Sequence, residues 1–508
     1  MKKKLIISVL FLSFIYNSYA HFDFNPQCRK AYTLALSMRF TEAKKILDSE
    51  KILSPSNDIP YYIDNYIDVL SIIANQDKNA YNKLINNKDA RLKRLEKADK
   101  NSPYYNCCLA DYYLLWAIAR LVFIDNITNM VEGLKAGVEI KKAYSLLDKN
   151  NKLYPDFVPN LKGLGLMHAL IDAVPDNYKS VIQAIAFKGT IKQGVSELKT
   201  LLDASINNDK YDYLRTEALF LLSNIQINLS GNKKEALALK KYYQHPKFAE
   251  LVKTSPMLSV SQAKIDIYNG LNDEAITLLT TCPSGSQYYP FFTPGYLAGV
   301  YKLNRLDKDA YRYFFDYIEK TPCRNYIKSS LQHIAWYYLL NNDEKKYKEY
   351  MQRVLKSGDN IVEIDKQAQR EAENKDIPNV VLLKARLLCD GGYYQLALNV
   401  LQDNAKKLNL KNKKDTLELY YRYARIYHEW DKIENAYSFY ERTIREGCYQ
   451  PYYFAANSAL QLGLIYENKK EYRKARLYYE RCLTLNPNEY KTSIQQKAKV
   501  GLSRIKGL

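Results

Sequence analysis

"LQLGLIYENKKEYRKARLYYERCLTLNPN", residues Leu460–Asn488, is the stretch that decides the fold. It places Gly463 inside a run that otherwise favours helix, where a glycine costs about 1 kcal/mol relative to alanine. A second small residue, Ala475, follows after a polar break, and Tyr479 comes four positions later. This pattern predicts two short helices that cross closely at the small residues, with Pro487 ending the second helix.

The same small–small–large pattern recurs along the chain in one register. Three consecutive copies begin at Ala385, Ala424 and Gly463, which lie 39 positions apart. A degenerate copy carries tyrosine at its second position. The further copies are Ala424/Ala436/Tyr440, Ala385/Ala397/Leu401, Ala298/Ala310/Phe314, Ala263/Ala275/Leu279, Ala31/Ala43/Leu47 and the degenerate Ala335/Tyr347/Met351.

This pattern resembles the tetratricopeptide repeat, which has a small residue in helix A, an alanine twelve positions later in helix B, and a late proline. The resemblance implies an all-α, right-handed α-solenoid of helix-turn-helix repeats whose A helices line a concave groove. An ordinary helical bundle with frequent alanines is the alternative. Recurrence in one register favours the repeats.

The chain divides into four predicted regions: a signal peptide (1–20), an N-terminal helical repeat region with a divergent middle (21–205), tetratricopeptide-like repeats (206–488) and a capping helix (489–508). Looser connections are expected at 245–255, 282–294 and 357–378. The last region places Ile494, Ala498, Leu502 and Ile505 on one helical face, which suits a helix that covers the end of a solenoid.

The divergent middle, residues 154–202, is rich in glycine and proline. Its layout "GLGL…VP…IAFKGTIKQGVSEL" resembles the outer-mitochondrial-membrane repeat family that includes the inclusion-body clearance protein. That resemblance implies a helical repeat architecture and no catalytic residue.

The first twenty residues predict export. "MKKKLIISVLFLSFIYNSYA" has three lysines, an apolar run of about a dozen residues and a small residue, Ala20, at the expected cleavage point. A retained anchor is the alternative, although the apolar run is shorter than the roughly 20 residues that span a bilayer. We therefore expect a periplasmic or secreted protein, with no integral membrane span after signal removal.

The composition and motifs of the chain give no indication of catalysis, metal binding or nucleic-acid binding. Its net charge of +20 is spread along the sequence, which favours weak attraction to acidic partners or anionic surfaces, and no nucleic-acid-binding motif is present. Its eight cysteines form no CxxC pair, and its five histidines form no metal-ligand spacing on a helix. We expect no catalytic site, no metal and no cofactor; an enzyme with an unrecognised site in the middle segment is the remaining alternative.

The repeat register predicts a binding surface. In related repeats, positions 2, 5, 9 and 12 of helix A face the concave side. Taking Ala385 and Ala424 as position 8 gives eight residues in these two repeats, and we take five of them as partner-binding candidates: Asn379, Arg386, Tyr421, Arg425 and His428.

Arg386 and Arg425 occupy equivalent positions, and we expect them to share one acidic group of a ligand, for which arginine's planar fork is suited. Pairing with local acids such as Glu418 is the alternative. The function we expect is binding of a protein or peptide partner without catalysis. A cell-envelope glycan-handling or outer-membrane-associated binding protein is the alternative function.

Overall fold

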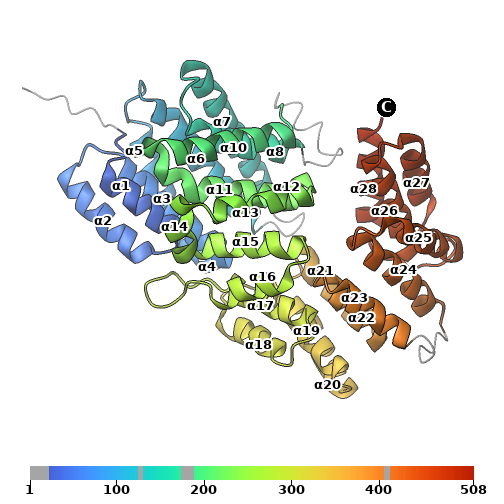
Figure 1. Cartoon of the computed structure of the whole chain (residues 1–508). Helices are drawn as coiled ribbons and strands as arrows, with labels where there is room; N and C mark the ends of the chain where they lie inside the picture. Colours follow the sequence, from blue (N-terminus) through green and yellow to red (C-terminus); the bar gives the residue numbers. More distant parts are fainter. Residues whose placement is uncertain (1–21, 124–129, 173–187, 405–411, 508) are drawn as a thin grey trace, which may run out of the picture.

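The computed structural model describes residues 22–123, 130–172, 188–404 and 412–507, and every regular element in these ranges is helical (Figure 1). The predicted signal peptide and part of the glycine-rich middle segment lie outside the described residues. The helices of the N-terminal half are α1 (Pro26–Leu36), α2 (Phe40–Leu53), α3 (Ile59–Asn75), α4 (Lys78–Leu84), α5 (Lys88–Leu95), α6 (Pro103–Leu121), α7 (Met130–Leu153), α8 (Asn160–Asp172), α10 (Ile191–Asn207), α11 (Arg215–Ile225), α12 (Lys233–Ala238), α13 (Lys240–Tyr243) and α14 (Ala249–Thr254).

Short 3-10 or π segments join some of them: η1 (Ile85–Asn87), η3 (Asp209–Leu214), η4 (Gln226–Ser230) and η5 (Pro246–Phe248). The C-terminal half continues as α15 (Pro256–Tyr268), α16 (Asn272–Thr280), α17 (Thr293–Asn304), α18 (Ala310–Lys320), α19 (Ile327–Leu340), α20 (Glu344–Lys356), α21 (Glu363–Asn374), α22 (Val380–Asp390), α23 (Tyr394–Asp403), α24 (Lys413–Glu429), α25 (Ile433–Gly447), α26 (Phe454–Asn468), α27 (Tyr472–Thr484) and α28 (Lys491–Arg504).

The predicted helical hairpins are confirmed. Each small–small–large triplet falls on two consecutive helices, which are α1–α2, α15–α16, α17–α18, α19–α20, α22–α23, α24–α25 and α26–α27. The alanines of these triplets have no exposed surface. Because small side chains let the two helix axes approach, each hairpin closes tightly and the next hairpin stacks on it, which builds the all-α solenoid seen in Figure 1.

Gly463 makes room for a tyrosine ring. A Cβ atom at this position would lie 2.5 Å from Cδ1 of Tyr479, closer than real Cβ contacts come. A Cβ at Gly501 would lie 2.4 Å from Cζ of the same ring. The two glycines, on α26 and α28, therefore hold the fully buried Tyr479 ring between two helices.

Helix α28 closes the C-terminal end of the array. It buries Ile494, Ala498 and Ile505 against the last hairpin. Arg504 donates to both carboxylate oxygens of Glu467, at 2.7 and 2.8 Å, and the Tyr479 hydroxyl donates to the same carboxylate. An apolar seam and a bidentate ion pair together fix this helix to α26 and α27.

Two stretches expected as loose connections contain helices: η5 and α14 lie within 245–255, and α21 lies within 357–378. Asp365 on α21 accepts hydrogen bonds from the backbone N–H groups of Tyr326, at 2.6 Å, and Ser329, at 2.8 Å, at the start of α19. Burial raises the pKa of Asp365 to about 6 although these donors oppose the rise. A carboxylate at a helix N-terminus satisfies otherwise unpaired donors, so α21 is anchored as an inserted helix between two repeats.

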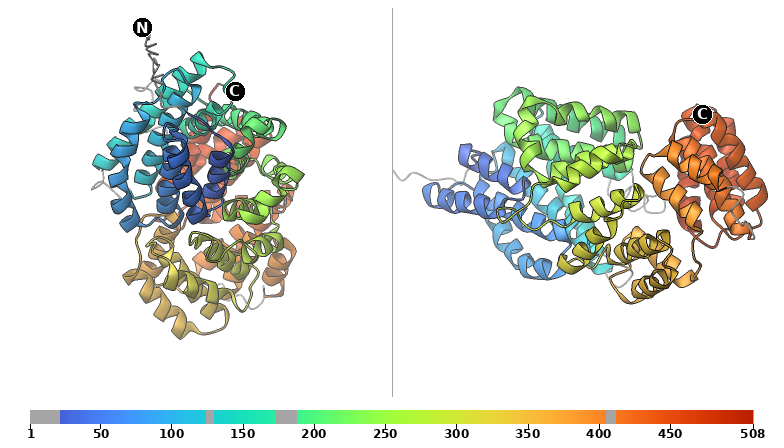
Figure 2. Two further views of the ribbon diagram at one scale, coloured as in Figure 1. Left: turned by 90° about the vertical axis from the view of Figure 1, so that its left-hand side faces the viewer. Right: turned by 60° about the horizontal axis from the view of Figure 1, so that its bottom comes forward.

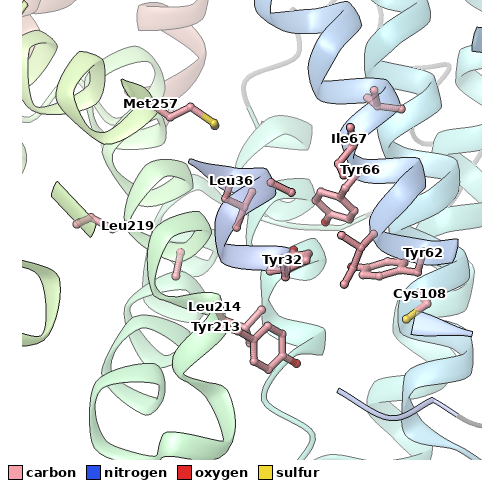
Figure 3. Close-up of a cluster of buried hydrophobic side chains, with 14 of the residues drawn as sticks. Tyr32, Leu36, Tyr62, Tyr66, Ile67, Cys108, Tyr213, Leu214, Leu219 and Met257 are labelled. Atoms are coloured by element: carbon pink, nitrogen blue, oxygen red, sulfur yellow. The ribbon is translucent and has the colours of Figure 1, made fainter. Parts of the chain in front are cut away.

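The N-terminal half has an aromatic core. Tyr32, Tyr62, Tyr66 and Tyr213 cluster where α1, α3 and η3 meet (Figure 3). The buried ammonium of Lys162 lies 2.7 Å from Asp111 and 2.7 Å from the Tyr66 hydroxyl. The Glu217 carboxylate lies 3.3 Å from the same ammonium. Burial alone would lower the pKa of Lys162, but these two carboxylates hold it well above its usual value.

The solenoid turns back on itself. The backbone N–H of Tyr289 donates to Met38 O at 2.7 Å, and Asn75 donates to Pro290 O at 2.6 Å, which ties the segment before α17 to the first helices. Further on, a Cβ at Gly392 would lie 2.3 Å from Gly270 O, so the turn after α22 touches the turn after α15. The right-hand view of Figure 2 shows the C-terminal helices at one end of the molecule and the first helices at the other, with helices from the middle of the chain between them.

Candidate partner-binding site

A hollow of about 360 Å³ opens at the starts of the late A helices. Its walls come from α21, α22 and α24 and from the residues that precede α26 and α28. The N-cap residues of four helices line it: Asn379, Asn412, Tyr453 and Tyr490. We call it the arginine hollow, because Arg370, Arg386 and Arg422 also line it.

Arg386 is the most available of these arginines. Its guanidinium lies over the Trp336 ring, 5.0 Å from the centroid, and the indole beneath is held by a 2.7 Å hydrogen bond to Glu371. Within the described residues, its ion-pair partner is Asp390 at 3.7 Å, and we find no hydrogen bond from its nitrogens. Stacking on a buried indole orients the planar fork while leaving N–H donors for a ligand.

Arg422 and Arg370 are more firmly held. Arg422 donates through Nε and Nη2 to one oxygen of Glu418, at 3.0 and 2.6 Å. Arg370 lies over the Tyr490 ring at 4.5 Å and donates to Glu363 at 2.7 Å, while its buried Nε has no hydrogen-bond partner. Arg422 thus keeps donors that its bonds to Glu418 do not use, whereas the unpaired Nε of Arg370 is buried and out of reach of a ligand.

Acidic residues balance these cations. Glu371 accepts from Trp336, Gln332 at 2.6 Å and Tyr347 at 3.4 Å, so its oxygens are occupied within the protein. Burial raises the pKa of Glu371, and it also raises the pKa of Asp415. A hollow with both signs of charge suits a ligand that carries one carboxylate among neutral polar groups better than it suits a polyanion.

A second hollow, of about 760 Å³, lies at the other ends of α22 and α24, facing α12 and α15. Glu429 there binds Arg425 at 2.7 Å and Lys233 at 2.6 Å. Although burial opposes it, these cations lower the pKa of Glu429 to about 2. The Lys233 contact joins α12 to α24 across this hollow, so the Glu429 carboxylate is already held by two cations of the protein.

The structure separates the five predicted site residues. Asn379 and Arg386 line the arginine hollow, and Asn379 also caps α22 by accepting from the backbone N–H of Val381 at 3.0 Å. Arg425 and His428 line the second hollow. Burial, together with Arg425, lowers the pKa of His428 to about 4. Tyr421 lines neither hollow: it is only 4% exposed and accepts a 2.6 Å hydrogen bond from Asn457.

Arg386 therefore shares its hollow with Arg422 and Arg370 rather than with Arg425. Each of the two equivalent arginines pairs with an acid four positions on, Asp390 for Arg386 and Glu429 for Arg425, as the local-acid alternative expects. The sequence argument missed Arg422, one position past the buried Tyr421. It also missed Arg370, because it expected no helix between 357 and 378.

Two further features concern the described part of the chain. No group of three or more histidine, cysteine, aspartate or glutamate side chains in it is arranged to hold a metal ion. Among its helices, none combines the length and the apolar character that crossing a bilayer requires.

Comparison with known proteins identifies the repeats. Residues 417–445 and 456–489 match the tetratricopeptide repeat family, so the C-terminal part of the chain contains tetratricopeptide repeats, which are generally scaffolds for protein interaction. A comparison with curated protein sequences finds no match. Among solved structures that match is the human IFIT1 dimer with PPP-AAAA, at 14% identity, 92% coverage of this chain, 96% coverage of that chain and a TM-score of 0.34. An overlap of that extent says nothing about what this chain binds.

Proposed function

We propose that this protein is an exported, non-catalytic scaffold that binds a polypeptide segment carrying an acidic side chain or a terminal carboxylate in the arginine hollow. The observation that carries the proposal is Arg386, which lines the hollow and stacks on Trp336 with no hydrogen bond from its nitrogens within the described residues. A carboxylate is the group whose two oxygens match this planar fork.

The surroundings of Arg386 favour a peptide over a small ion. A neighbouring hollow of about 370 Å³ shares Arg370, Lys414 and Tyr452 with the arginine hollow. An extended chain can therefore continue past the first contact. Asparagine caps and tyrosine hydroxyls along the way offer hydrogen bonds to a peptide backbone.

Helix ends add to the attraction for a carboxylate. The N-termini of α22, α24, α26 and α28 meet at the hollow, and each carries partial positive charge. Glu418, bound to Arg422, and Asp376, bound to Lys414 at 2.6 Å, limit how much negative charge can enter. One carboxylate is accommodated and a dense cluster of them is not.

The test is selection from a random-peptide library on the wild-type protein, followed by affinity measurement with the selected peptides. Arg386→Ala should weaken binding roughly 10- to 100-fold, the range for losing a hydrogen bond to a charged group. Arg476→Ala is the matched control, because Arg476 lies exposed on α27, away from the hollow. Selected peptides without acidic groups, or equal affinity for Arg386→Ala, would overturn the proposal.

Export is the second part of the proposal. It rests on the lysine-led apolar leader ending at Ala20. N-terminal sequencing of protein recovered from its native cell should begin at His21. Recovery of the chain with Met1 retained in the membrane fraction would contradict export by a cleaved signal.

A further inference from the structure

Helix α7 carries an exposed apolar stripe that the proposed function does not use. Val131, Leu134 and Val138 are 63, 66 and 67% exposed. Their spacing of three and four residues places them on one face of the helix. Large aliphatic side chains so exposed, and gathered on one helical stripe, mark a surface that meets a partner rather than water.

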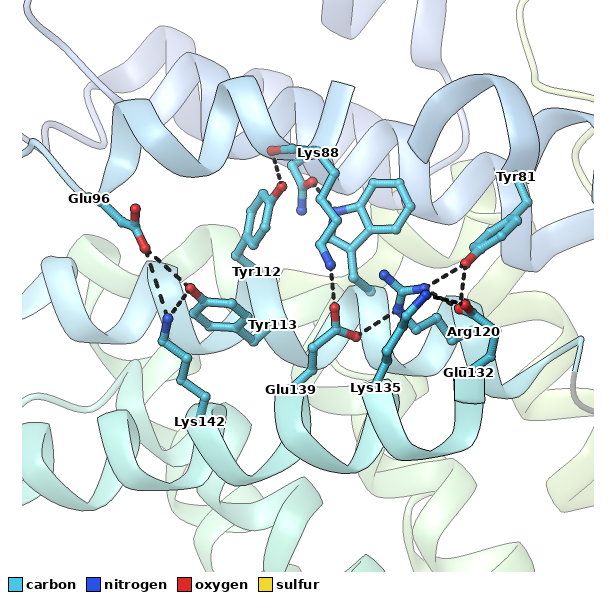
Figure 4. Close-up of polar contacts among 12 residues, drawn as sticks. Tyr81, Lys88, Glu96, Tyr112, Tyr113, Arg120, Glu132, Lys135, Glu139 and Lys142 are labelled. Atoms are coloured by element: carbon cyan, nitrogen blue, oxygen red, sulfur yellow. Dashed lines mark hydrogen bonds and ion pairs between the residues drawn. The ribbon is translucent and has the colours of Figure 1, made fainter. Parts of the chain in front are cut away.

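The opposite side of α7 is fixed to the protein. Glu139 is buried and accepts from Arg120 at 3.0 Å, and it also pairs with Lys88 (Figure 4). Ala143 and Leu147 are fully buried against α6 and α8. The helix therefore cannot rotate to hide its apolar stripe.

Lysines continue the same stripe toward the end of α7. Counting on from Val138 in steps of three or four reaches Lys141, Lys142 and Lys149, all exposed. Lys142 is already bound to the Tyr113 hydroxyl at 2.5 Å. No ion pair from Lys141 or Lys149 is found within the described ranges, while Lys152 pairs with the neighbouring Asp148 at 2.7 Å. The stripe is apolar in its first half and basic in its second, and the chain as a whole carries +20.

We infer that α7 docks the protein on an anionic lipid surface, with its aliphatic residues entering the interface and its lysines contacting headgroups. Charge complementarity selects this occupant. Unpaired lysines next to exposed aliphatic residues match a bilayer surface, where anionic headgroups lie over an apolar acyl region. The acidic side chain of Glu132, near the stripe, adds little repulsion from anionic headgroups, because it is already bound to Arg120 and Lys135. The docking leaves the arginine hollow unused, so it is independent of peptide binding.

Vesicle co-sedimentation with the full chain tests the inference. Binding should be strong to vesicles of phosphatidylcholine with phosphatidylglycerol, weak to phosphatidylcholine alone, and should fall with added salt. Val131→Ser/Leu134→Ser/Val138→Ser should reduce binding at least about ten-fold. Lys141→Gln/Lys149→Gln should reduce it roughly five-fold per lysine.

The control is Ile52→Ser/Leu53→Ser on α2, which removes two aliphatic residues that are 80 and 78% exposed. Its vesicle binding should equal that of the wild type, and circular dichroism should show all variants folded. Absence of binding to anionic vesicles would overturn the inference, as would equal binding by the α7 variants. Concentration-dependent dimerisation that depends on Val131 and Leu134, without lipid binding, would instead assign the stripe to a second copy and also overturn it.

Discussion

Replacing Gly463 by alanine tests the packing that defines the last repeat. The new methyl group would lie 2.5 Å from the Tyr479 ring. The backbone of Gly501 also packs close to this ring, since a Cβ atom at Gly501 would lie 2.4 Å from Tyr479 Cζ. Overpacking of a core costs about 1–3 kcal/mol, and the ring has no room to retreat, so the upper part of this range applies. Against this cost, alanine stabilises the helix by about 1 kcal/mol relative to glycine, because its helix propensity is higher. The net expectation is a destabilisation of about 2 kcal/mol.

Native-state hydrogen exchange of α26 and α27 measures this locally, which matters because a long repeat array need not unfold in one step. A loss of about 2 kcal/mol corresponds to exchange roughly 30 times faster in these helices. Gly137→Ala is the matched control: no atom lies within 4 Å of a Cβ there, so the change should stabilise α7 slightly. In a Tyr479→Leu background, Gly463→Ala should become neutral or stabilising. A destabilisation that persists without the tyrosine ring would refute the packing argument.

Three further predictions concern other parts of the chain. Deleting residues 489–508 uncovers Tyr479 and should lower the thermal midpoint and promote aggregation; an equally stable, soluble truncation would show that α28 is not a cap. Burial lowers the pKa of His333 to about 4, so the unfolded chain binds its proton more readily below pH 6.5. The contribution of His333 to the free energy of unfolding should therefore fall by about 2 kcal/mol between pH 7 and pH 5. In urea titrations the wild type should lose about 2 kcal/mol more over this range than His333→Gln, because His428 and Asp365 titrate alike in both proteins. Lys162→Met leaves Asp111 and Glu217 buried without their cation and should cost about 3–5 kcal/mol, measured by the same titrations; a smaller loss would show that water or rearranged tyrosines compensate.

The repeat architecture was predictable because it depends on local spacing. Gly463, Ala424 and Ala385 must be small wherever two helices cross closely, and that requirement is visible in the sequence alone. Helix α21 was not predictable in this way, because its buried face consists of Asp365, Ala368 and Ala372, which give little hydrophobic periodicity. Its position depends on an acidic side chain capping a helix elsewhere in the chain.

The site was predictable only in part. The register placed Asn379 and Arg386 on an inner wall, and the structure has both at the arginine hollow. It also selected Tyr421, whose ring is instead packed beneath Phe454 in the core. The curvature of the superhelix and the inserted helix α21 determine which side chains line the arginine hollow. Neither feature can be read from the repeat register.

The central claim is that a polypeptide binds at the starts of the late A helices. Hydrogen–deuterium exchange of the wild-type protein, with and without a library-selected peptide, tests it most directly. The account predicts slower exchange in the first turns of α22, α24 and α26 and in the segment before α28, with no change in α7. Protection confined to other helices, or the same protection pattern in Arg386→Ala at equal peptide concentration below saturation, would contradict it.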